Sequence, residues 1–141
     1  MEKLTLDGLI FSTTEIHIEN HILTITLNRP EKKNAINNVM MNELNYVINY
    51  AKQEKNIRVV VINAKGDIFC AGADLSRAES ESNVPELDYA NDISLSLRHL
   101  YKPVICSIQG SVLAGALLMV TNSTHAIAVN VAKFSPPEIH R

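Results

Sequence analysis

The sequence predicts one α/β domain, and three observations support this fold class. A β-branched run at residues 59–62 has the character of a buried strand, and residues 104–108 form another. Segments with the apolar period of amphipathic helices precede both runs. Turns of small residues follow the strands, at 71–73 and at 110–116. We therefore expect strands that alternate with helices around one core.

The first expected element is a hairpin over residues 9–28. Its second strand, at 22–27, places three apolar side chains on one face: Leu23, Ile25 and Leu27. Pro30 ends this strand because proline cannot donate to a ladder. A charged loop at 29–36 follows.

A helix is expected next, over about residues 38–54, with Asn37 or Asn38 as its N-cap. One stripe of this helix is apolar: Met40, Leu44, Val47 and Ala51. The strand at 58–63 is apolar on both faces, which is typical of a strand with helices on both sides.

The remaining elements are shorter. Residues 64–84 are rich in loop-forming residues, and a helix is expected at 85–101 with four inward side chains: Leu87, Ile93, Leu97 and Leu100. A strand at 104–108, a short buried helix at 114–123 and a strand at 126–129 follow. Two prolines, Pro136 and Pro137, end the regular structure. No repeat or linker interrupts the chain, so residues 1–141 are expected to form a single domain.

The composition excludes several classes of function. The chain has 141 residues, 46% of them apolar and 20% charged, which is typical of a globular domain that buries roughly 70% of its unfolded surface. Its net charge is −2 and no basic face is evident, so nucleic acid and anionic membranes are poor partners. The longest apolar run, at 112–120, is too short to span a bilayer.

Two cysteines, Cys70 and Cys106, fit neither a zinc pattern nor a disulfide framework. We expect both to be small buried apolar residues in a reducing cytoplasm. The N-terminus lacks the apolar core of a signal peptide.

Four segments of the chain are informative when they are taken together in this order: residues 25–36, 69–75, 102–115 and 132–139. On these segments the chain resembles the N-terminal half of the enoyl-CoA hydratase/isomerase superfamily, also called the crotonase family. The resemblance extends over residues 10–141. It implies a spiral of ββα units that binds acyl-CoA thioesters and stabilises an enolate on the thioester carbonyl.

The same resemblance implies roles for individual residues. The backbone N–H groups of Ala73 and Gly115 would form the oxyanion hole, with Gly115 at the positive start of the helix at 114–123. Glu138 would be the acid/base. The implied substrate-binding residues are Lys32, Lys33, Ala35, Ala71, Asp74 (through its backbone), Leu75 and Ser76. No cofactor is expected, since coenzyme A is part of the substrate, and a homo-oligomer such as a trimer is the expected assembly.

The sequence departs from the family pattern in two ways. Leu118 stands where two-glutamate hydratases carry a second glutamate, which disfavours hydration and leaves a single-glutamate reaction, such as isomerisation, open. The chain also ends at Arg141, whereas family members continue for a comparable length. We therefore expect a fragment, an obligate oligomer or an altered fold.

Other interpretations of these residues remain open. The small residues at 71–73 also suit a tightly packed turn, and Glu138 also suits a solvated loop. A catalytically silent chain that binds acyl-CoA or associates with other subunits is the alternative function. A serine hydrolase using Ser107 or Ser111 is weaker because no nucleophile elbow is present, and no phosphate-loop motif occurs.

Overall fold

The structure is a computed structural model that describes residues 2–74, 82–87, 92–113, 116–130 and 132–135. The described elements are, in chain order, β1 (Thr14–Glu19), β2 (Ile22–Leu27), the 3₁₀ turn η1 (Pro30–Lys32), α1 (Asn38–Gln53), β3 (Val59–Ala64), β4 (Ile68–Cys70), α2 (Ile93–Arg98), β5 (Val104–Ile108), β6 (Ser111–Leu113), α3 (Ala116–Thr121), β7 (His125–Ala128) and β8 (Phe134–Ser135).

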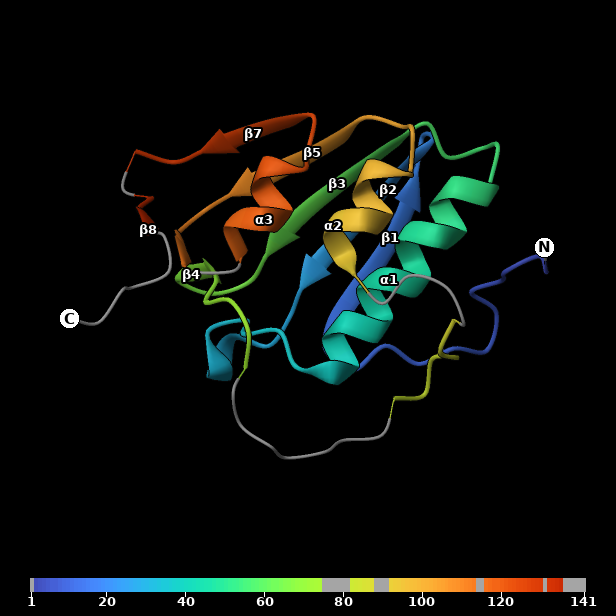
Figure 1. Ribbon diagram of the computed structural model, residues 1–141, viewed down its shortest axis with the longest axis horizontal. Coiled ribbons are helices and arrows are strands. Elements are labelled where there is room, and N and C mark those ends of the chain that lie inside the picture. The colour runs from blue at the N-terminus through green and yellow to red at the C-terminus, as the bar shows by residue number, and fades with distance from the viewer. Residues whose placement is uncertain (1, 75–81, 88–91, 114–115, 131, 136–141) are drawn as a thin grey trace.

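The strands form two sheets. The larger has the order β1-β2-β3-β5-β7, in which β1 is antiparallel to β2 and the other pairs are parallel (Figure 1). The smaller has the order β4-β6-β8 and is parallel throughout. From β3 onward, consecutive strands alternate between the sheets, and α2 and α3 follow β4 and β6. The chain therefore repeats a ββα unit, which confirms the predicted spiral and α/β class.

The corners between the two sheets stack on each other. Gly110, between β5 and β6, lies against the corner between β3 and β4: a Cβ atom at position 110 would be 2.0 Å from the carbonyl oxygen of Asp67. No side chain fits in that space, so glycine is required for this close approach of two backbones. The sequence analysis grouped Gly110 with a small-residue turn, and the structure gives it this packing role.

The hairpin and first helix match their predicted positions. Asn20 and His21, at the hairpin turn, have φ angles of 52° and 67°, the left-handed conformation that suits the twist of a two-residue loop. The predicted inward side chains of β2 are fully buried: Leu23, Ile25 and Leu27. Of the two candidate caps, Asn37 caps α1, since its Oδ1 accepts a hydrogen bond from the Met40 amide at 2.9 Å.

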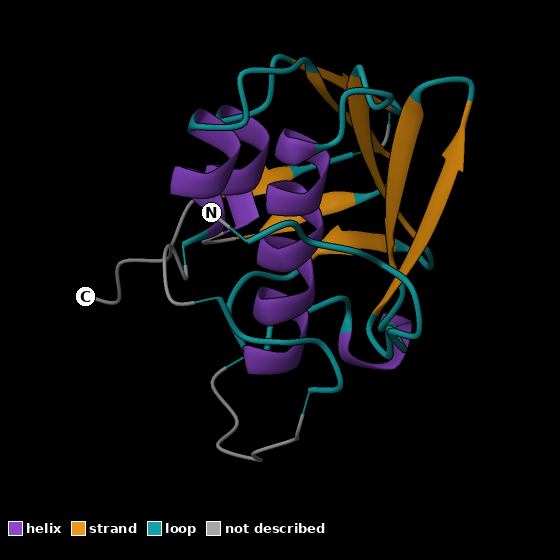
Figure 2. Ribbon diagram, turned by 90° about the vertical axis from the view of Figure 1, so that its right-hand side faces the viewer, coloured by secondary structure: helices purple, strands orange, loops and turns teal. Residues whose placement is uncertain are grey.

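Helices α1, α2 and α3 cover one face of the larger sheet (Figure 2). The expectation of helices on both sides of β3 was therefore wrong for the described residues. Burial alternates along β3: Val60 and Ile62 are fully buried under the helices, whereas Val59 and Val61 are partly exposed on the other face. The β-branched run reflects strand propensity as well as burial.

The second helix is shorter than predicted. It begins at Ile93, where the Oδ1 of Asp92 accepts a hydrogen bond from the Ser94 amide at 2.9 Å. Residues 82–87 are not helical, because Asn42 on α1 donates to the carbonyl of Val84 at 2.7 Å and holds that segment as a loop. Side chains Ile93, Leu97 and Leu100 are buried as predicted.

Three short strands, β4, β6 and β8, were not predicted. They contain three, three and two residues and exist through pairing with one another, so no local periodicity marks them. Helix α3 lies within its predicted range, and the prediction at Pro136 and Pro137 falls outside the described residues. In the part of the chain that the structure describes, no helix is long and apolar enough to span a membrane.

A buried carboxylate joins the N-terminal segment to α1. Glu43 is fully buried and accepts hydrogen bonds from two amides and three hydroxyls. The donors belong to three consecutive residues: Ser12, Thr13 and Thr14. A buried charge without an opposite charge needs such a set of donors, so Glu43 fixes the start of β1 on the helix.

Candidate functional site

Two segments far apart in the sequence lie side by side at one end of the sheets. The loop after β2 pairs with the residues after β4 through an isolated parallel bridge between Ile36 and Ala73. The Ile36 amide donates to Gly72 O at 2.7 Å, and the Asp74 amide donates to Ile36 O at 2.9 Å. The Ala71 amide donates to Lys33 O at 3.1 Å. Sequence segments predicted to share one site are therefore in direct contact.

The Ala73 amide differs from its neighbours. Ala71 and Asp74 donate to the adjacent loop, and the Gly72 amide lies against the Cys70 thiol. Within the described residues, the Ala73 N–H has no acceptor, and the residue is exposed. In this bridge Ile36 makes both hydrogen bonds, through its amide to Gly72 and its carbonyl to Asp74, so the amide of Ala73 points away from the 29–36 loop. Gly72 has a φ of +92°, which glycine adopts without strain and which permits this turn.

Asn34 clamps the loop at 29–36 to the β3–β4 corner. Its side chain is fully buried, and its amide donates to Lys65 O at 2.8 Å and to Ile68 O at 3.0 Å. Its Oδ1 accepts from the Arg29 amide at 2.7 Å. Asn34 has a φ of 54°, a left-handed conformation that asparagine tolerates better than most residues. The sequence analysis included Asn34 in a family signature but gave it no role.

Arg29 and Asp74 form an ion pair across the two segments. The distance from Arg29 Nη1 to Asp74 Oδ2 is 2.7 Å, and the side chains are 15% and 12% exposed. The same Nη1 donates to Ala35 O at 2.9 Å. The pair spans 45 positions of the sequence, so no local pattern indicates it. Asp74 was predicted to contribute through its backbone, and the structure shows that its carboxylate also links the segments.

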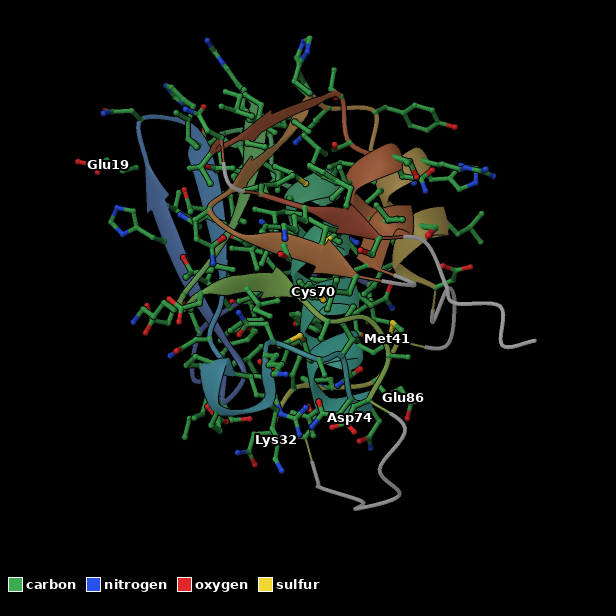
Figure 3. All side chains as sticks on the ribbon, turned by 90° about the vertical axis from the view of Figure 1, so that its left-hand side faces the viewer. Glu19, Lys32, Met41, Cys70, Asp74 and Glu86 are labelled. Atoms are coloured by element: carbon green, nitrogen blue, oxygen red, sulfur yellow. The ribbon has the colours of Figure 1, made fainter. Side chains whose placement is uncertain are left out.

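Lys32 and Lys33 are exposed beside these segments. Figure 3 shows Lys32, Asp74 and Glu86 at the same end of the molecule, with Glu19 at the other. An open cavity of about 380 Å³ adjoins Lys33, and its lining includes Lys65 and the Gly66 backbone. The Lys65 ammonium is paired with Glu15 at 2.6 Å and Asp67 also lines this cavity, so Lys33 is the better candidate for contact with an anionic ligand group there.

The cysteines are confirmed as buried apolar residues. Cys70 and Cys106 are both fully buried and free of disulfides. Burial raises the pKa of each thiol to about 11, so both are protonated near neutral pH. The Cys70 thiol donates to Asn34 O at 3.1 Å, which adds it to the packing beneath the site.

Several predicted site residues fall outside the described residues: Gly115, Glu138, Leu75 and Ser76. Position 118 lies in α3, and its side chain is likewise outside the description. The structure thus brings together the predicted residues of the first two signatures: Lys32, Lys33, Ala35, Ala71, Ala73 and Asp74. Among the described residues, no group of three or more histidine, cysteine or acidic side chains is arranged to hold a metal ion.

Comparison with known proteins places this arrangement in a family. The family model described as enoyl-CoA hydratase/isomerase matches residues 17–140. The chain is 33% identical over 125 residues to a trans-2-decenoyl-[acyl-carrier-protein] isomerase of Streptococcus mutans, covering 84% of this chain and 48% of that protein. It is also 33% identical over 124 residues to a mevalonyl-coenzyme A hydratase of Aspergillus fumigatus, covering 86% and 46%.

Solved structures show the same fold. A crystal structure described as a probable enoyl-CoA hydratase from Mycobacterium smegmatis matches with a TM-score of 0.75 and 30% identity, covering 89% of this chain and 52% of that one. This chain therefore spans about half the length of the relatives that it matches. On the family model, the sequence identity and the shared fold together, the chain belongs to the enoyl-CoA hydratase/isomerase family.

Proposed function

We propose that this chain carries the oxyanion-hole half of an enzyme that acts on acyl-CoA thioesters through an enolate. The observation that carries the proposal is the Ala73 N–H, which points away from the adjacent loop and has no acceptor among the described residues, between two paired neighbours. A donor held rigidly by the backbone on both sides needs little reorganisation when negative charge develops on a thioester oxygen. Family membership supplies the class of substrate.

The second donor and the acid/base of the proposal come from the family resemblance. The Gly115 N–H would be the second donor, at the start of the segment that continues as α3. Glu138 would remove a proton from the carbon next to the thioester and return it elsewhere on the chain, which needs one carboxylate. Leu118 in place of a second glutamate favours this isomerase-type transfer over hydration. Relatives are named for both reactions.

The coenzyme A part of the substrate would lie along the joined segments. Lys32 and Lys33 would contact phosphate groups, a role that their exposure beside the joined segments and the cavity beside Lys33 support. The remaining contacts of the proposal, which the family resemblance supplies, would line the path toward Ala73: Ala35, Ala71, Asp74, Leu75 and Ser76. We expect Lys32→Ala with Lys33→Ala to raise KM for acyl-CoA several-fold with kcat unchanged, because phosphate contacts are the same in ground and transition states.

The proposed assembly is a homo-oligomer, which light scattering of the purified chain tests.

The decisive experiment assays the 141-residue chain with a 2-enoyl-CoA and a 3-enoyl-CoA, with products separated by chromatography. Glu138→Gln is expected to abolish conversion. Ala73→Pro and Gly115→Pro each remove one N–H and are expected to lower kcat by about 100-fold or more, whereas Ala73→Gly and Gly115→Ala keep the N–H and serve as matched controls.

The outcomes separate the alternatives. Conversion of a 3-enoyl-CoA that depends on Glu138 supports an isomerase, and hydration of a 2-enoyl-CoA contradicts the inference from Leu118. Full activity of Gly115→Pro or Ala73→Pro contradicts the oxyanion-hole assignment. Calorimetric binding of a saturated acyl-CoA without conversion of either substrate supports the silent binding chain, which the half-length match to relatives also motivates.

A further inference from the structure

Arg29 contacts both of the segments that meet at Ala73. One guanidinium nitrogen, Nη1, donates both to Asp74 Oδ2 at 2.7 Å and to Ala35 O at 2.9 Å. Ala35 and Asp74 flank the two residues of the isolated bridge, Ile36 and Ala73. The guanidinium therefore links the two segments beside the bridge. They are joined by a side chain as well as by backbone hydrogen bonds.

This ion pair is more sheltered from water than another pair of similar length. Lys65 Nζ and Glu15 Oε1 are 2.6 Å apart, but their side chains are 50% and 52% exposed. The side chains of Arg29 and Asp74 are 15% and 12% exposed. Attraction between charges strengthens as water is excluded, and an uncompensated charge in the same place becomes costly. The pair of Arg29 and Asp74 is thus suited to hold a geometry, whereas the exposed pair provides a matched control.

Arg29 is itself fixed from below. Its backbone amide donates to Asn34 Oδ1 at 2.7 Å, and Asn34 is anchored on Lys65 O and Ile68 O. The backbone at Arg29 is therefore fixed relative to the β3–β4 corner, and the ion pair holds Asp74 in place relative to the same corner. The Ala73 N–H lies in the peptide plane between Gly72 and Ala73, and a fixed Asp74 restricts the backbone rotation at Ala73 that would turn this plane.

We propose that Arg29 is a positioning residue, which acts through Asp74 and Ala35 to aim the Ala73 N–H at the ligand. This inference rests on the proposed function, in which Ala73 supplies an oxyanion donor. A donor misplaced by about 1 Å loses on the order of 100-fold in rate, so the ion pair affects catalysis without touching substrate.

The test substitutes each partner by a neutral residue of similar shape: Arg29→Gln, Asp74→Asn and the double variant. In each, kcat for the enoyl-CoA substrate is expected to fall by about 10- to 100-fold while KM changes little, because the donor acts on charge that develops in the transition state. The double variant is expected to be no worse than Arg29→Gln alone, since Arg29→Gln already removes the ion pair with Asp74. Glu15→Gln, which disrupts the exposed pair, is expected to leave kcat unchanged.

Amide hydrogen exchange provides a readout that does not need turnover. The Ile36 and Asp74 amides form the bridge, and each is expected to exchange roughly tenfold faster in Arg29→Gln, while amides of β2 keep their protection. Unchanged exchange of these two amides would overturn the positioning role. Faster exchange with unchanged kcat in an active enzyme would overturn it as well.

The two proposals fail differently. If the unsubstituted chain neither converts nor binds acyl-CoA, the proposed function fails, and the inferred role of Arg29 toward substrate fails with it. If the unsubstituted chain is active and additive losses occur in the double variant, the coupling between Arg29 and Asp74 is overturned and the proposed function stands. Equal losses in kcat for both single variants and the double variant support the inference.

Discussion

Strands β2 and β7 belong to the same sheet but differ in how far their apolar side chains are exposed to solvent. The inward residues of β2, Leu23, Ile25 and Leu27, are fully buried. All four residues of β7 are exposed, and Ile127 is 65% exposed. Both strands are apolar in sequence, and both were predicted. The difference therefore comes from their neighbours and not from their composition.

The neighbours differ in number and kind. Strand β2 pairs with β1 on one edge and β3 on the other, and buried residues of α1 join its inward residues in one core cluster. Strand β7 pairs with β5, and within the described residues no strand pairs with its other edge. A strand at a sheet edge leaves apolar side chains and backbone groups uncovered, so the same propensity gives a core strand in one place and an open edge in another.

The largest expected effect lies on the buried side of this comparison. Leu44→Ala is expected to lower the free energy of unfolding by about 2–5 kcal/mol, because the fully buried side chain leaves a cavity among the buried residues of α1, β2 and β3. Urea denaturation followed by circular dichroism measures this. A loss no larger than that of Ile127→Ala would contradict the comparison.

The same comparison of buried with exposed positions can be made for carboxylates, with the buried Glu43 and the exposed Glu15. Glu43→Gln is expected to lower the free energy of unfolding by about 2–3 kcal/mol, because the Gln NH₂ group would face donors that now contact a charged acceptor. The matched control is Glu15→Gln, whose carboxylate is 52% exposed and whose loss is expected to cost less than about 1 kcal/mol. Equal losses would show that burial does not decide the cost.

The buried Cys70 thiol is expected to make the free energy of unfolding depend on pH. Burial raises its pKa from 9.0 to about 11. Between these values the unfolded chain releases the proton and the folded chain retains it, so the free energy of unfolding falls as pH rises from 9.0 to about 11. The expected loss is about 2 kcal/mol relative to pH 8, and Cys70→Ala is expected to lose this contribution. Urea unfolding of both proteins across this range measures the difference, and identical pH profiles would contradict it.

The smallest effect is expected on the open edge. Ile127→Ala removes a side chain that is already 65% exposed, so the free energy of unfolding is expected to change by less than about 0.5 kcal/mol. The same urea titration measures it. A loss above about 2 kcal/mol would show that β7 is covered in solution, and light scattering would then identify a second copy of the chain as the cover.

The elements that the sequence predicted well have a strong local signal. Helix α1 has an apolar stripe and an asparagine cap, and β2 has a clear alternation. Helix α2 was predicted to begin at residue 85, but residues 85–87 belong to a segment that α1 holds as a loop through Asn42, and the described helix begins at Ile93. Local period indicates that a helix exists, whereas capping and contacts fix its ends.

Residues of the candidate site could be predicted from the sequence, but the contacts between them could not. The small residues around Ala73 and the charged residues around Lys32 are visible in the sequence. The ion pair of Arg29 and Asp74 joins residues 45 positions apart, and nothing local indicates it. Sequence alone also could not show that Ala71 and Asp74 donate their amides to the 29–36 loop, whereas the Ala73 amide has no acceptor in the described part of the chain.

The sequence by itself determined which segments become α1, β2, β3 and β5, because apolar periodicity and capping act over a few residues. It also carried the four signatures that identify the family. Only the tertiary structure decided which face of the sheet the helices cover, which strands form the second sheet, and which amides of the 71–74 segment donate to the neighbouring 29–36 loop. These depend on contacts between residues distant in the chain, and such contacts form only when the ββα units stack.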